Sequence, residues 1–463
     1  MWLQQIIRTE TGCATYLVGA DNGECLVFDP LWDIRPVLAA AEKKDARIRY
    51  VIDSHTHADH VSGARRLAAV CGAELILPQG AEAEYAVRRI KDLDRIRMGE
   101  VVLEVAHVPG HRPEQINLVV TDESRGDAPW CILTADFLLV GDIARPDLAQ
   151  GGVDGAAEIF DQALPRIAGL LDFVEVYPGH VAGSTCGRVT SGKHVTTLGY
   201  ERRFNPALTI TGREAFIHYL NQGQPSRPAN VEEIVRINQG RRPYAFDLPV
   251  ILPMSPDALA ERIGSKGIFV IDTRDAGAFG DGHIPGSHNV QLSESEFEQR
   301  VGWILPDDHR ILLVGAGEED AQQALLKLAF LGLESRVDRF LAGGFQAWEA
   351  AGKPAAQLAQ VMPAELSGWL SQLEGEKPTV LDVREPDEWA AGHVDGAVRI
   401  SYKELDREPE ALGLDRDRPV VVYCAGGNRS STAGSILNRR GFKRVHNLTG
   451  GLDAWKAAEL PVR

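Results

Sequence analysis

The C-terminal half of the chain contains two copies of one sequence pattern. FVIDTRDAGAFGDGHIPGSHNV at 269–290 aligns with TVLDVREPDEWAAGHVDGAVRI at 379–400, so that Arg274 and His283 match Arg384 and His393 at an offset of 110 residues. Each copy ends alike, with LAGGFQAWEAAGKP at 341–354 and LTGGLDAWKAAELP at 448–461. This period is too long for a solenoid unit and suits a whole small domain. The pattern therefore predicts two similar domains in tandem.

Within each copy, short β-branched runs such as FVID and VVVYC alternate with helical stretches such as STAGSILNRRG. That alternation predicts a parallel sheet covered by helices. The N-terminal part differs: it opens with two strands around an Asp-Asn-Gly turn and ends in a Pro-rich passage at 205–250. We therefore expect an α/β multidomain protein with domains at 1–250, which includes the linker, 251–355 and 356–463.

Bulk properties exclude some classes of partner. The chain has 463 residues and a net charge of −16 without a basic stripe, which argues against nucleic acid. It shows no secretory signal pattern at its start and no apolar run long enough to span a bilayer. Its six cysteines include no CxxC pair, which is typical of a reducing, cytoplasmic setting in which a thiol acts alone.

Histidine and aspartate residues follow several predicted strands of the first domain. VIDSHTHADHVSGA at 51–64 carries an H-x-H-x-D-H motif, and single residues follow in VPGHRPEQINL, LTADFLLVGD and YPGH. The seven candidate ligands are His55, His57, Asp59, His60, His111, Asp136 and His180. A lone histidine after a Pro-Gly turn is rarely a ligand, but four such loops can converge on one sheet edge. Imidazole and carboxylate ligands suit zinc, iron or manganese.

Residues 1–245 resemble the metallo-β-lactamase superfamily through these motifs. The resemblance implies an αβ/βα sandwich with the metal site at one edge. In hydrolytic members such as glyoxalase II, the positions of His55, His57 and His111 hold one metal ion. Those of Asp59, His60 and His180 hold a second, and that of Asp136 bridges the two. A thioester hydrolase with two zinc ions thus remains an alternative.

The segment TADFLLVGDIARPDLAQGG at 134–152 resembles the persulfide dioxygenase branch, in which Gly-x-x-Arg-x-Asp follows the ligand aspartate. The resemblance implies one mononuclear Fe(II) held by His55, His111 and Asp136. A triad of two histidines and one carboxylate leaves positions open for a persulfide and dioxygen. The other four residues, His57, Asp59, His60 and His180, would then be outer-shell hydrogen-bonding groups.

Two further residues of this domain are candidates for binding substrate. Arg145 is suited to a substrate carboxylate or phosphate, with an ordinary surface role as the alternative. Cys186 lies in the Gly-rich stretch GHVAGSTCGRVTSG at 179–192, which resembles persulfide dioxygenases fused to rhodaneses. Cys186 is a candidate for receiving sulfane sulfur, although a passive loop thiol is the more ordinary interpretation.

The third domain contains VVYCAGGNRSSTAG at 421–434. A cysteine between a buried strand and a Gly-rich turn that opens a helix lies in an anion-binding nest, which favours a thiolate or persulfide. Residues 356–463 resemble a rhodanese sulfurtransferase. The resemblance implies that Cys424 is the nucleophile carrying sulfane sulfur and that Arg429 helps to bind the anion. The predicted persulfide loop further comprises Ala425, Gly426, Gly427, Asn428 and Ser430.

The middle copy lacks these groups. Its aligned stretch LLVGAGEED at 312–320 places Val314 at the cysteine position and Glu319 at the arginine position. Without a thiol, a persulfide cannot form, and a glutamate repels anions. We therefore expect residues 251–355 to be an inactive rhodanese-like domain.

Together the resemblances imply iron- and dioxygen-dependent oxidation of a low-molecular-weight thiol persulfide to sulfite, with sulfur transfer through Cys424 giving thiosulfate, as in sulfide detoxification. The thiol carrier is of the glutathione, coenzyme A or bacillithiol type, and the sequence leaves it open. The rivals are a dinuclear zinc hydrolase and a sulfur-relay adaptor with no catalysis in the first domain. The sequence is also compatible with a homo-oligomer, and it predicts neither a nucleic-acid nor a membrane partner.

Overall fold

The computed structural model describes residues 1–463 except 149–153, 183–186, 189–190, 225–226, 373 and 406–412. The chain divides into two compact units. The first contains Met1–Asp247 together with Ala329–Gly332, and the second contains Leu248–Leu328 and Leu333–Arg463. Within the described residues, no helix combines the length and the apolarity needed to cross a membrane.

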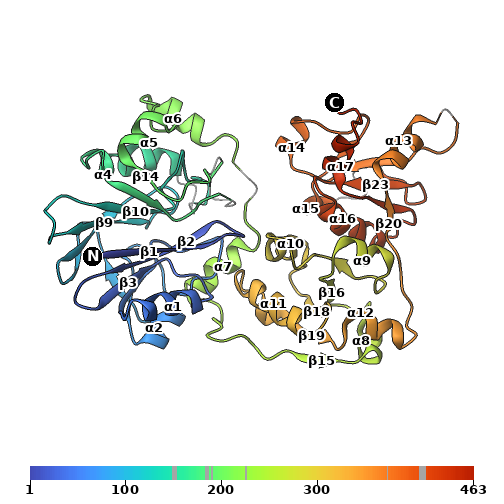
Figure 1. The fold of residues 1–463 in the computed structure, drawn as a ribbon, viewed down its shortest axis with the longest axis horizontal. Helices are drawn as coiled ribbons and strands as arrows, with labels where there is room; N and C mark the ends of the chain where they lie inside the picture. The colour runs from blue at the N-terminus through green and yellow to red at the C-terminus, as the bar shows by residue number, and fades with distance from the viewer. Residues whose placement is uncertain (149–153, 183–186, 189–190, 225–226, 373, 406–412) are drawn as a thin grey trace. The chain divides into compact units, whose positions relative to one another are not determined.

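The first unit is built on two six-stranded sheets that face each other (Figure 1). The first sheet contains, in spatial order, β1 (Trp2–Arg8), β2 (Cys13–Gly19), β3 (Glu24–Phe28), β4 (Arg47–Ile52), β5 (Glu74–Pro78) and β6 (Arg88–Ile90). The second contains β14 (Thr196–Thr197), β13 (Glu175–Pro178), β10 (Cys131–Ala135), β9 (Ile116–Asp122), β8 (Val101–His107) and β7 (Arg95–Met98). A short hairpin, β11 (Leu138–Leu139) and β12 (Asp142–Ile143), follows β10.

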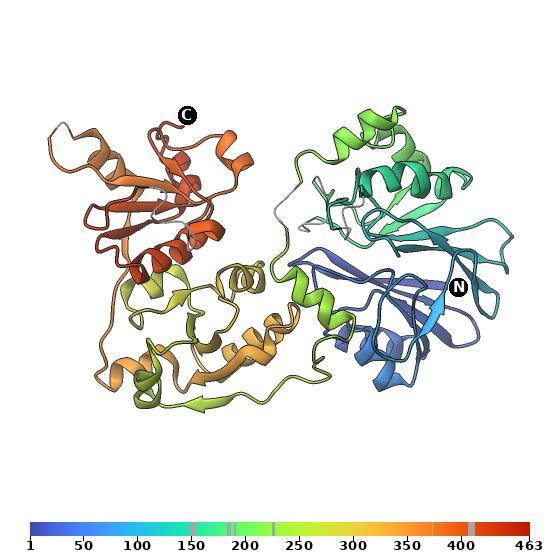
Figure 2. The same ribbon diagram turned by 180° about the vertical axis from the view of Figure 1, so that it is seen from behind.

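Helices cover the outer faces of both sheets, as Figure 2 shows from behind. Those of the first sheet are α1 (Arg35–Lys43) and α2 (Ala64–Cys71). Those beyond the second are α3 (Gly155–Glu158), the π-helix η1 (Ile159–Ala163), α4 (Leu164–Ala168), α5 (Leu198–Phe204) and α6 (Arg213–Leu220); α7 (Val231–Asn238) comes last in this unit.

The layers follow from the two-residue period of a strand. Tyr16 and Val18 of β2 point into the core between the sheets, whereas Leu17 points outward into the cluster that α1 and α2 cover. Ile132 of β10 likewise lies in the outer cluster with Phe216 of α6. Because both faces of each central strand are buried, the unit is an αβ/βα sandwich.

The second unit contains two five-stranded sheets with the same strand order. The middle domain has β15 (Leu252–Met254), β19 (Val337–Leu341), β18 (Arg310–Val314), β16 (Ile268–Asp272) and β17 (His288–Asn289) in spatial order. The third domain has β20 (Ala359–Val361), β24 (Val445–Leu448), β23 (Val420–Tyr423), β21 (Thr379–Asp382) and β22 (Val398–Arg399). Neighbouring strands are parallel in both sheets.

Helices connect these parallel strands. In the middle domain they are α8 (Pro256–Arg262), α9 (Ala276–Asp281), α10 (Phe297–Ile304), α11 (Glu318–Ala329), the 3₁₀ helix η2 (Glu334–Arg336) and α12 (Gly344–Ala350). In the third domain they are α13 (Pro363–Ser371), α14 (Pro386–Ala390), α15 (Tyr402–Leu405), α16 (Asn428–Arg439) and α17 (Gly451–Ala457). The alternation of strand and helix that the sequence showed is present in both copies.

The repeated arginine has a structural role. Nη2 of Arg384 lies 2.6 Å from Oδ2 of Asp382 and donates to the carbonyl of Gly392 at 2.8 Å. Arg274 makes the equivalent ion pair with Asp272, also at 2.6 Å. The aspartate closes a central strand and is fully buried in both copies. A buried carboxylate needs such a partner, which explains why the arginine occurs in both copies.

The Gly-Gly turn that occurs in both copies can be tested by replacing one of its glycines with alanine. At Gly451, whose φ is +57°, an added Cβ would lie 2.4 Å from the carbonyl oxygen of Cys424 and 2.3 Å from that of Ala425. We expect Gly451→Ala to lower the free energy of unfolding of the second unit by about 2–4 kcal/mol. The backbone carbonyls of Cys424 and Ala425 must move away from the new Cβ, and the alanine must also adopt a strained positive φ. Denaturant unfolding followed by tryptophan fluorescence measures it.

The matched control is Gly441→Ala. Its φ is +89°, but no atom lies within 4 Å of the added Cβ, so only the conformational strain applies. Equal losses in the two variants would contradict the proposed clash with the cysteine loop.

Candidate metal centre and sulfur-transfer loop

The seven metal-ligand candidates come from four loops, each directly after a strand of the first unit. The H-x-H-x-D-H motif follows β4, His111 follows β8, Asp136 follows β10 and His180 follows β13. All seven side chains are buried. Ala135, which ends β10, has a φ of 43°, a left-handed conformation that is unusual for alanine. This backbone turn places the Asp136 carboxylate at the sheet edge.

Three unpartnered atoms converge at this edge. Nε2 of His55, Nε2 of His111 and Oδ2 of Asp136 are buried and make no hydrogen bond to any described residue. Oδ2 of Asp136 lies 3.9 Å from the His55 nitrogen and 3.4 Å from the His111 nitrogen. Buried polar atoms without partners are rare and costly. Such a set is suited to binding a cation.

The remaining polar atoms of these side chains are held in place. Nδ1 of His111 donates to the carbonyl of Arg145 at 2.9 Å, which leaves the Nε2 lone pair free for a metal. Nδ1 of His55 lies 2.8 Å from the Ser54 hydroxyl. Oδ1 of Asp136 lies 2.6 Å from Nδ1 of His180. Each ligand candidate is therefore oriented by a second contact.

The protonation states suit metal binding. Burial lowers the pKa of His111 and holds that of His55 well below its ordinary value, so both rings favour the neutral form. Burial alone would raise the pKa of Asp136, but the neighbouring His180 ring holds it below its usual range. Two neutral imidazoles and one carboxylate are the forms in which these side chains bind a metal.

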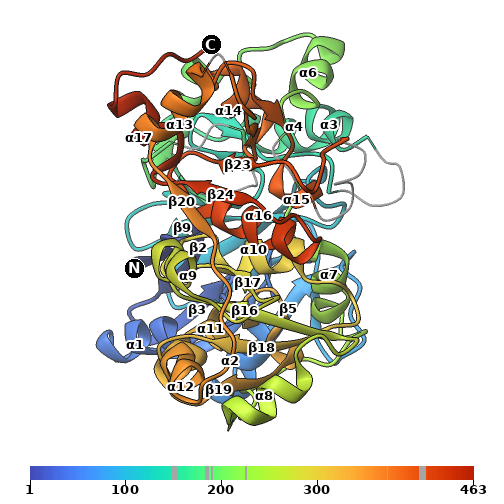
Figure 3. The ribbon, with the colours of Figure 1, turned by 90° about the vertical axis from the view of Figure 1, so that its right-hand side faces the viewer.

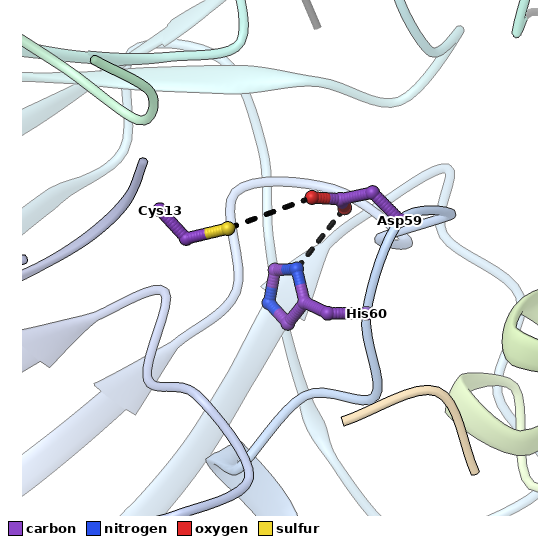
Figure 4. Close-up of side chains that lie close together, drawn as sticks. All are labelled: Cys13, Asp59 and His60. Atoms are coloured by element: carbon purple, nitrogen blue, oxygen red, sulfur yellow. Dashed lines mark hydrogen bonds and ion pairs between the residues drawn. The ribbon is translucent and has the colours of Figure 1, made fainter. Parts of the chain in front are cut away.

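A second buried cluster adjoins the first. Oδ2 of Asp59 lies 3.1 Å from Nε2 of His180, and its Oδ1 lies 3.0 Å from Nδ1 of His60. The thiol of Cys13 donates to Asp59 at 3.8 Å (Figure 4). Cys13 begins β2 and forms a β-bridge with His180, so only the tertiary fold brings it here. Sequence analysis did not select Cys13 as a site residue, because no nearby motif marks it.

His57 makes different contacts. Its Nε2 donates to Oδ1 of Asp29 at 3.2 Å and lies 3.9 Å from Asp53. Although burial disfavours the charged ring, Asp29 raises the pKa of His57 to about 9. Asp29 also accepts from the backbone N–H of Ser54 at 2.6 Å, which ties β3 to the histidine loop. Neither aspartate was selected from the sequence.

Arg145 is deeply buried, at 1% exposure. Its guanidinium pairs with Asp147 at 2.7 and 2.8 Å, and its carbonyl orients His111. The arginine of the Gly-x-x-Arg-x-Asp pattern thus supports the site through its backbone. Cys186, the other substrate-binding candidate, lies outside the described residues.

The predicted sulfur loop lies between β23 and α16. The thiol of Cys424 is 1% exposed and accepts from the N–H of Gly427 at 3.1 Å. The hydroxyl of Ser430 donates to Oδ1 of Asn447 at 2.6 Å, and its oxygen lies 3.5 Å from the Cys424 sulfur. The N–H of Gly427 would stabilise a sulfur anion. Arg429 forms a two-fold ion pair with Glu388, at 2.7 and 2.6 Å. Glu388, which sequence analysis missed, neutralises much of the cationic charge at the loop end.

The middle copy has the matching backbone without the reactive group. β18 ends at Val314, and Glu319 lies in the first turn of α11. Val314 pairs with Asp272 as Tyr423 pairs with Asp382, so Val314 matches Tyr423 and the predicted match to Cys424 is wrong by one residue. The residue at the cysteine position is Gly315, which has no side chain at all.

Comparison with known proteins assigns both parts of the chain. The metallo-beta-lactamase superfamily model matches residues 8–196, and the rhodanese-like domain model matches residues 255–351 and 366–458. Human persulfide dioxygenase ETHE1, a mitochondrial protein, is 29% identical over 241 residues, which are 51% of this chain and 87% of that protein. The probable adenylyltransferase/sulfurtransferase MoeZ of Mycobacterium tuberculosis is 40% identical over 108 residues, 23% of this chain and 27% of that protein.

A solved structure agrees with these assignments. The metallo-beta-lactamase from Staphylococcus aureus subsp. aureus COL is 28% identical with a TM-score of 0.66, covering 74% of this chain and 99% of its own. The chain is thus a fusion of a metallo-beta-lactamase-fold domain with two rhodanese-like domains. Its first domain is homologous to persulfide dioxygenases, and the chain is an enzyme. The predicted fold class is confirmed.

Gly179, which precedes His180, provides a test of the metal cluster. An added Cβ would lie 2.7 Å from Oδ1 of Asp136 and 2.8 Å from the carbonyl carbon of Ala135. We expect Gly179→Ala to displace the carboxylate and to weaken metal binding about 10-fold or more without removing a ligand. Metal content after equilibrium dialysis measures this effect.

The control is Gly169→Ala, at the end of α4, where no atom lies within 4 Å of the added Cβ. Normal metal binding by Gly179→Ala would contradict the assignment of Asp136 to the metal cluster.

Proposed function

We propose that the first domain is a mononuclear iron persulfide dioxygenase and that the third domain transfers sulfane sulfur through Cys424. The observation that carries the proposal is the set of three unpartnered, buried atoms of His55, His111 and Asp136. Two histidines and one carboxylate are the ligand set of non-haem iron oxygenases. The homology to human persulfide dioxygenase points to the same chemistry.

His55, His111 and Asp136 would hold the ferrous ion. When bound, iron supplies dioxygen binding and redox chemistry. The chain contributes the surroundings: Ser54 and the Arg145 carbonyl fix the two rings, and His180 holds the second oxygen of Asp136. Burial of these side chains strengthens the interactions among them. Overall, RSSH + O₂ + H₂O gives RSH + SO₃²⁻ + 2 H⁺.

In the third domain, the thiolate of Cys424 would attack the outer sulfur of a second thiol persulfide, RSSH. The S–S bond of the donor breaks, the thiol RSH leaves, and Cys424 carries the sulfur as Cys424–S–S⁻. Attack by sulfite on the outer sulfur breaks the S–S bond, forms thiosulfate and returns the thiolate. The N–H of Gly427 already points at the Cys424 sulfur and would stabilise the anion at both stages, and the hydroxyl oxygen of Ser430 lies 3.5 Å from the same sulfur. Glutathione, coenzyme A and bacillithiol persulfides are the candidate carriers.

A second candidate function rests on the second cluster. Nε2 of His60 is buried without a partner among the described residues, and Asp59 and His180 lie beside it. These groups could hold a second ion, as a dinuclear zinc thioester hydrolase would require. Two zinc ions per chain, thioester hydrolysis and no dioxygen uptake with persulfide would establish that function instead.

Removal of one proposed iron ligand tests the oxygenase. We expect His111→Ala to lose bound iron and persulfide-dependent dioxygen uptake, by about 100-fold or more, because the metal keeps only two protein ligands. Anaerobic purification, metal quantification and an oxygen electrode provide the measurements. The control is His218→Ala, an exposed histidine on α6. Unchanged iron content and uptake in His111→Ala would refute the proposed site.

Removal of the thiol tests the coupling. We expect Cys424→Ser to consume dioxygen normally while sulfite accumulates in place of thiosulfate, because a hydroxyl cannot carry sulfane sulfur. Chromatography of the sulfur anions distinguishes the products. Cys71→Ser, at the end of α2, serves as the control. Thiosulfate formation at the wild-type rate by Cys424→Ser would show that the third domain plays no part in it.

A further inference from the structure

The helix that follows the cysteine loop is anchored to the middle domain. The α16 helix packs beside β17 of that domain (Figure 3). The hydroxyl of Ser431 donates to Oδ1 of Asn289 and that of Thr432 donates to the Asn289 carbonyl, both at 2.6 Å. The N–H of Asn289 in turn donates to the Ser435 hydroxyl at 3.2 Å. All four residues are buried, so these bonds form away from bulk water.

A second contact lies at the first residue of the same helix. Nδ2 of Asn428 donates to Oε1 of Glu294 at 2.5 Å. Oε2 of Glu294 lies 3.4 Å from a guanidinium nitrogen of Arg300, whose side chain is 5% exposed. The amine of Lys327 also donates to the backbone carbonyl of Glu294 at 3.2 Å. The Glu294 carboxylate thus contacts Arg300 of its own middle domain through one oxygen and Asn428 of the third domain through the other.

These two contacts are joined by a chain of hydrogen-bonded side chains, and the backbone of α16 closes that chain into a ring. Arg300 donates to Oε1 of Gln291 at 3.2 Å, and the amide of Gln291 donates to Oδ1 of Asn289. The ring therefore runs through Ser431, Asn289, Gln291, Arg300, Glu294 and Asn428. Asn428 and Ser431 are one helical turn apart, so the ring binds the first turn of α16 through hydrogen bonds at two positions.

The first turn of α16 lies directly beside the groups that surround the Cys424 sulfur. Gly427, which donates to Sγ of Cys424, immediately precedes Asn428. Ser430, whose hydroxyl oxygen lies 3.5 Å from the same sulfur, lies between the two anchored residues. Moving the first turn of α16 would move both groups. The middle domain, which has no thiol in its own loop, is thereby connected to the Cys424 sulfur of the third domain. The connection consists of the hydrogen bonds above and the first turn of α16.

We propose that Glu294 of the middle domain is a positioning residue for the sulfur-transfer site. It holds Asn428 and, through Arg300 and Gln291, Asn289, so that the N–H of Gly427 stays aimed at the Cys424 sulfur and the Ser430 hydroxyl stays beside it. This role gives the inactive domain a function that needs no thiol. The inference rests on the proposed function of Cys424 as the sulfur carrier.

A rival explanation is that Glu294 acts only as a negative charge near the sulfur. The charged groups around the loop are Arg429, which pairs with Glu388, and Glu294 and Glu296, which lie 3.4 and 3.8 Å from Arg300. The two explanations predict opposite signs. Loss of a nearby negative charge would favour the thiolate, whereas loss of the positioned donor would disfavour it.

The test compares Glu294→Ala with Glu294→Gln in the full chain, because the glutamine oxygen can still accept from Asn428. We expect Glu294→Ala to raise the pH midpoint of Cys424 alkylation by about one unit and to lower kcat for sulfur transfer from thiosulfate to cyanide about 10-fold. Glu294→Gln should shift both by less than half as much. A downward shift of the midpoint in both variants would establish the charge explanation and overturn the proposal.

Further variants separate positioning from loss of folding. Asn428→Ala should reproduce the effect from the other side, and the double variant should be no worse than either single one. Glu261→Ala, an exposed carboxylate on α8, is the control. A lower Tm with an unchanged alkylation midpoint in Glu294→Ala would show a merely structural role. Alkylation does not require sulfur transfer, so absence of transfer in the wild type would refute only the proposed function of Cys424.

Discussion

The first domain depends on the desolvation of its histidine and aspartate cluster. Two packed sheets bury seven such side chains at one edge, where water cannot satisfy them. Hydrogen bonds within the cluster satisfy many of the atoms, but one atom each of His55, His57, His60, His111 and Asp136 stays unpartnered among the described residues. A bound cation removes that cost, because its binding free energy adds to the stability of the fold. Metal binding and folding of this edge are therefore linked.

Hydrogen bonding decides how the seven residues divide. His57 donates to Asp29, and His180 lies within hydrogen-bond distance of both Asp59 and Asp136. Nitrogen atoms used in this way are not available to a metal in the same arrangement. The ligand atoms of His55, His111 and Asp136 make no such hydrogen bond, and neither does Nε2 of His60 beside them. One ligand motif can thus serve a one-metal or a two-metal centre, and its outer contacts select between them.

The sequence predicts the features that repeat or lie in short motifs. The tandem copies, the H-x-H-x-D-H loop and the cysteine loop are local, and the period of each pattern identifies the surrounding elements. It could not predict Cys13 beside Asp59 or Glu388 beside Arg429, because 46 and 41 residues separate these pairs. Such contacts depend on how separate strands and helices pack together. The sequence likewise gave no reason to select Glu294, which is an ordinary acidic residue in a loop.

The two rhodanese-like copies show which part of the pattern serves the fold and which serves the chemistry. Both keep the aspartate at the end of the central strand and its arginine, since an unpaired buried carboxylate would destabilise either domain. Of the two copies only the third domain has a thiol, because the strand pairing places Gly315 at that position in the middle copy. The middle domain, without a thiol at this position, packs against α16 of the third domain. The hydrogen-bond ring through Asn289 and Glu294 holds the helix that begins next to Cys424.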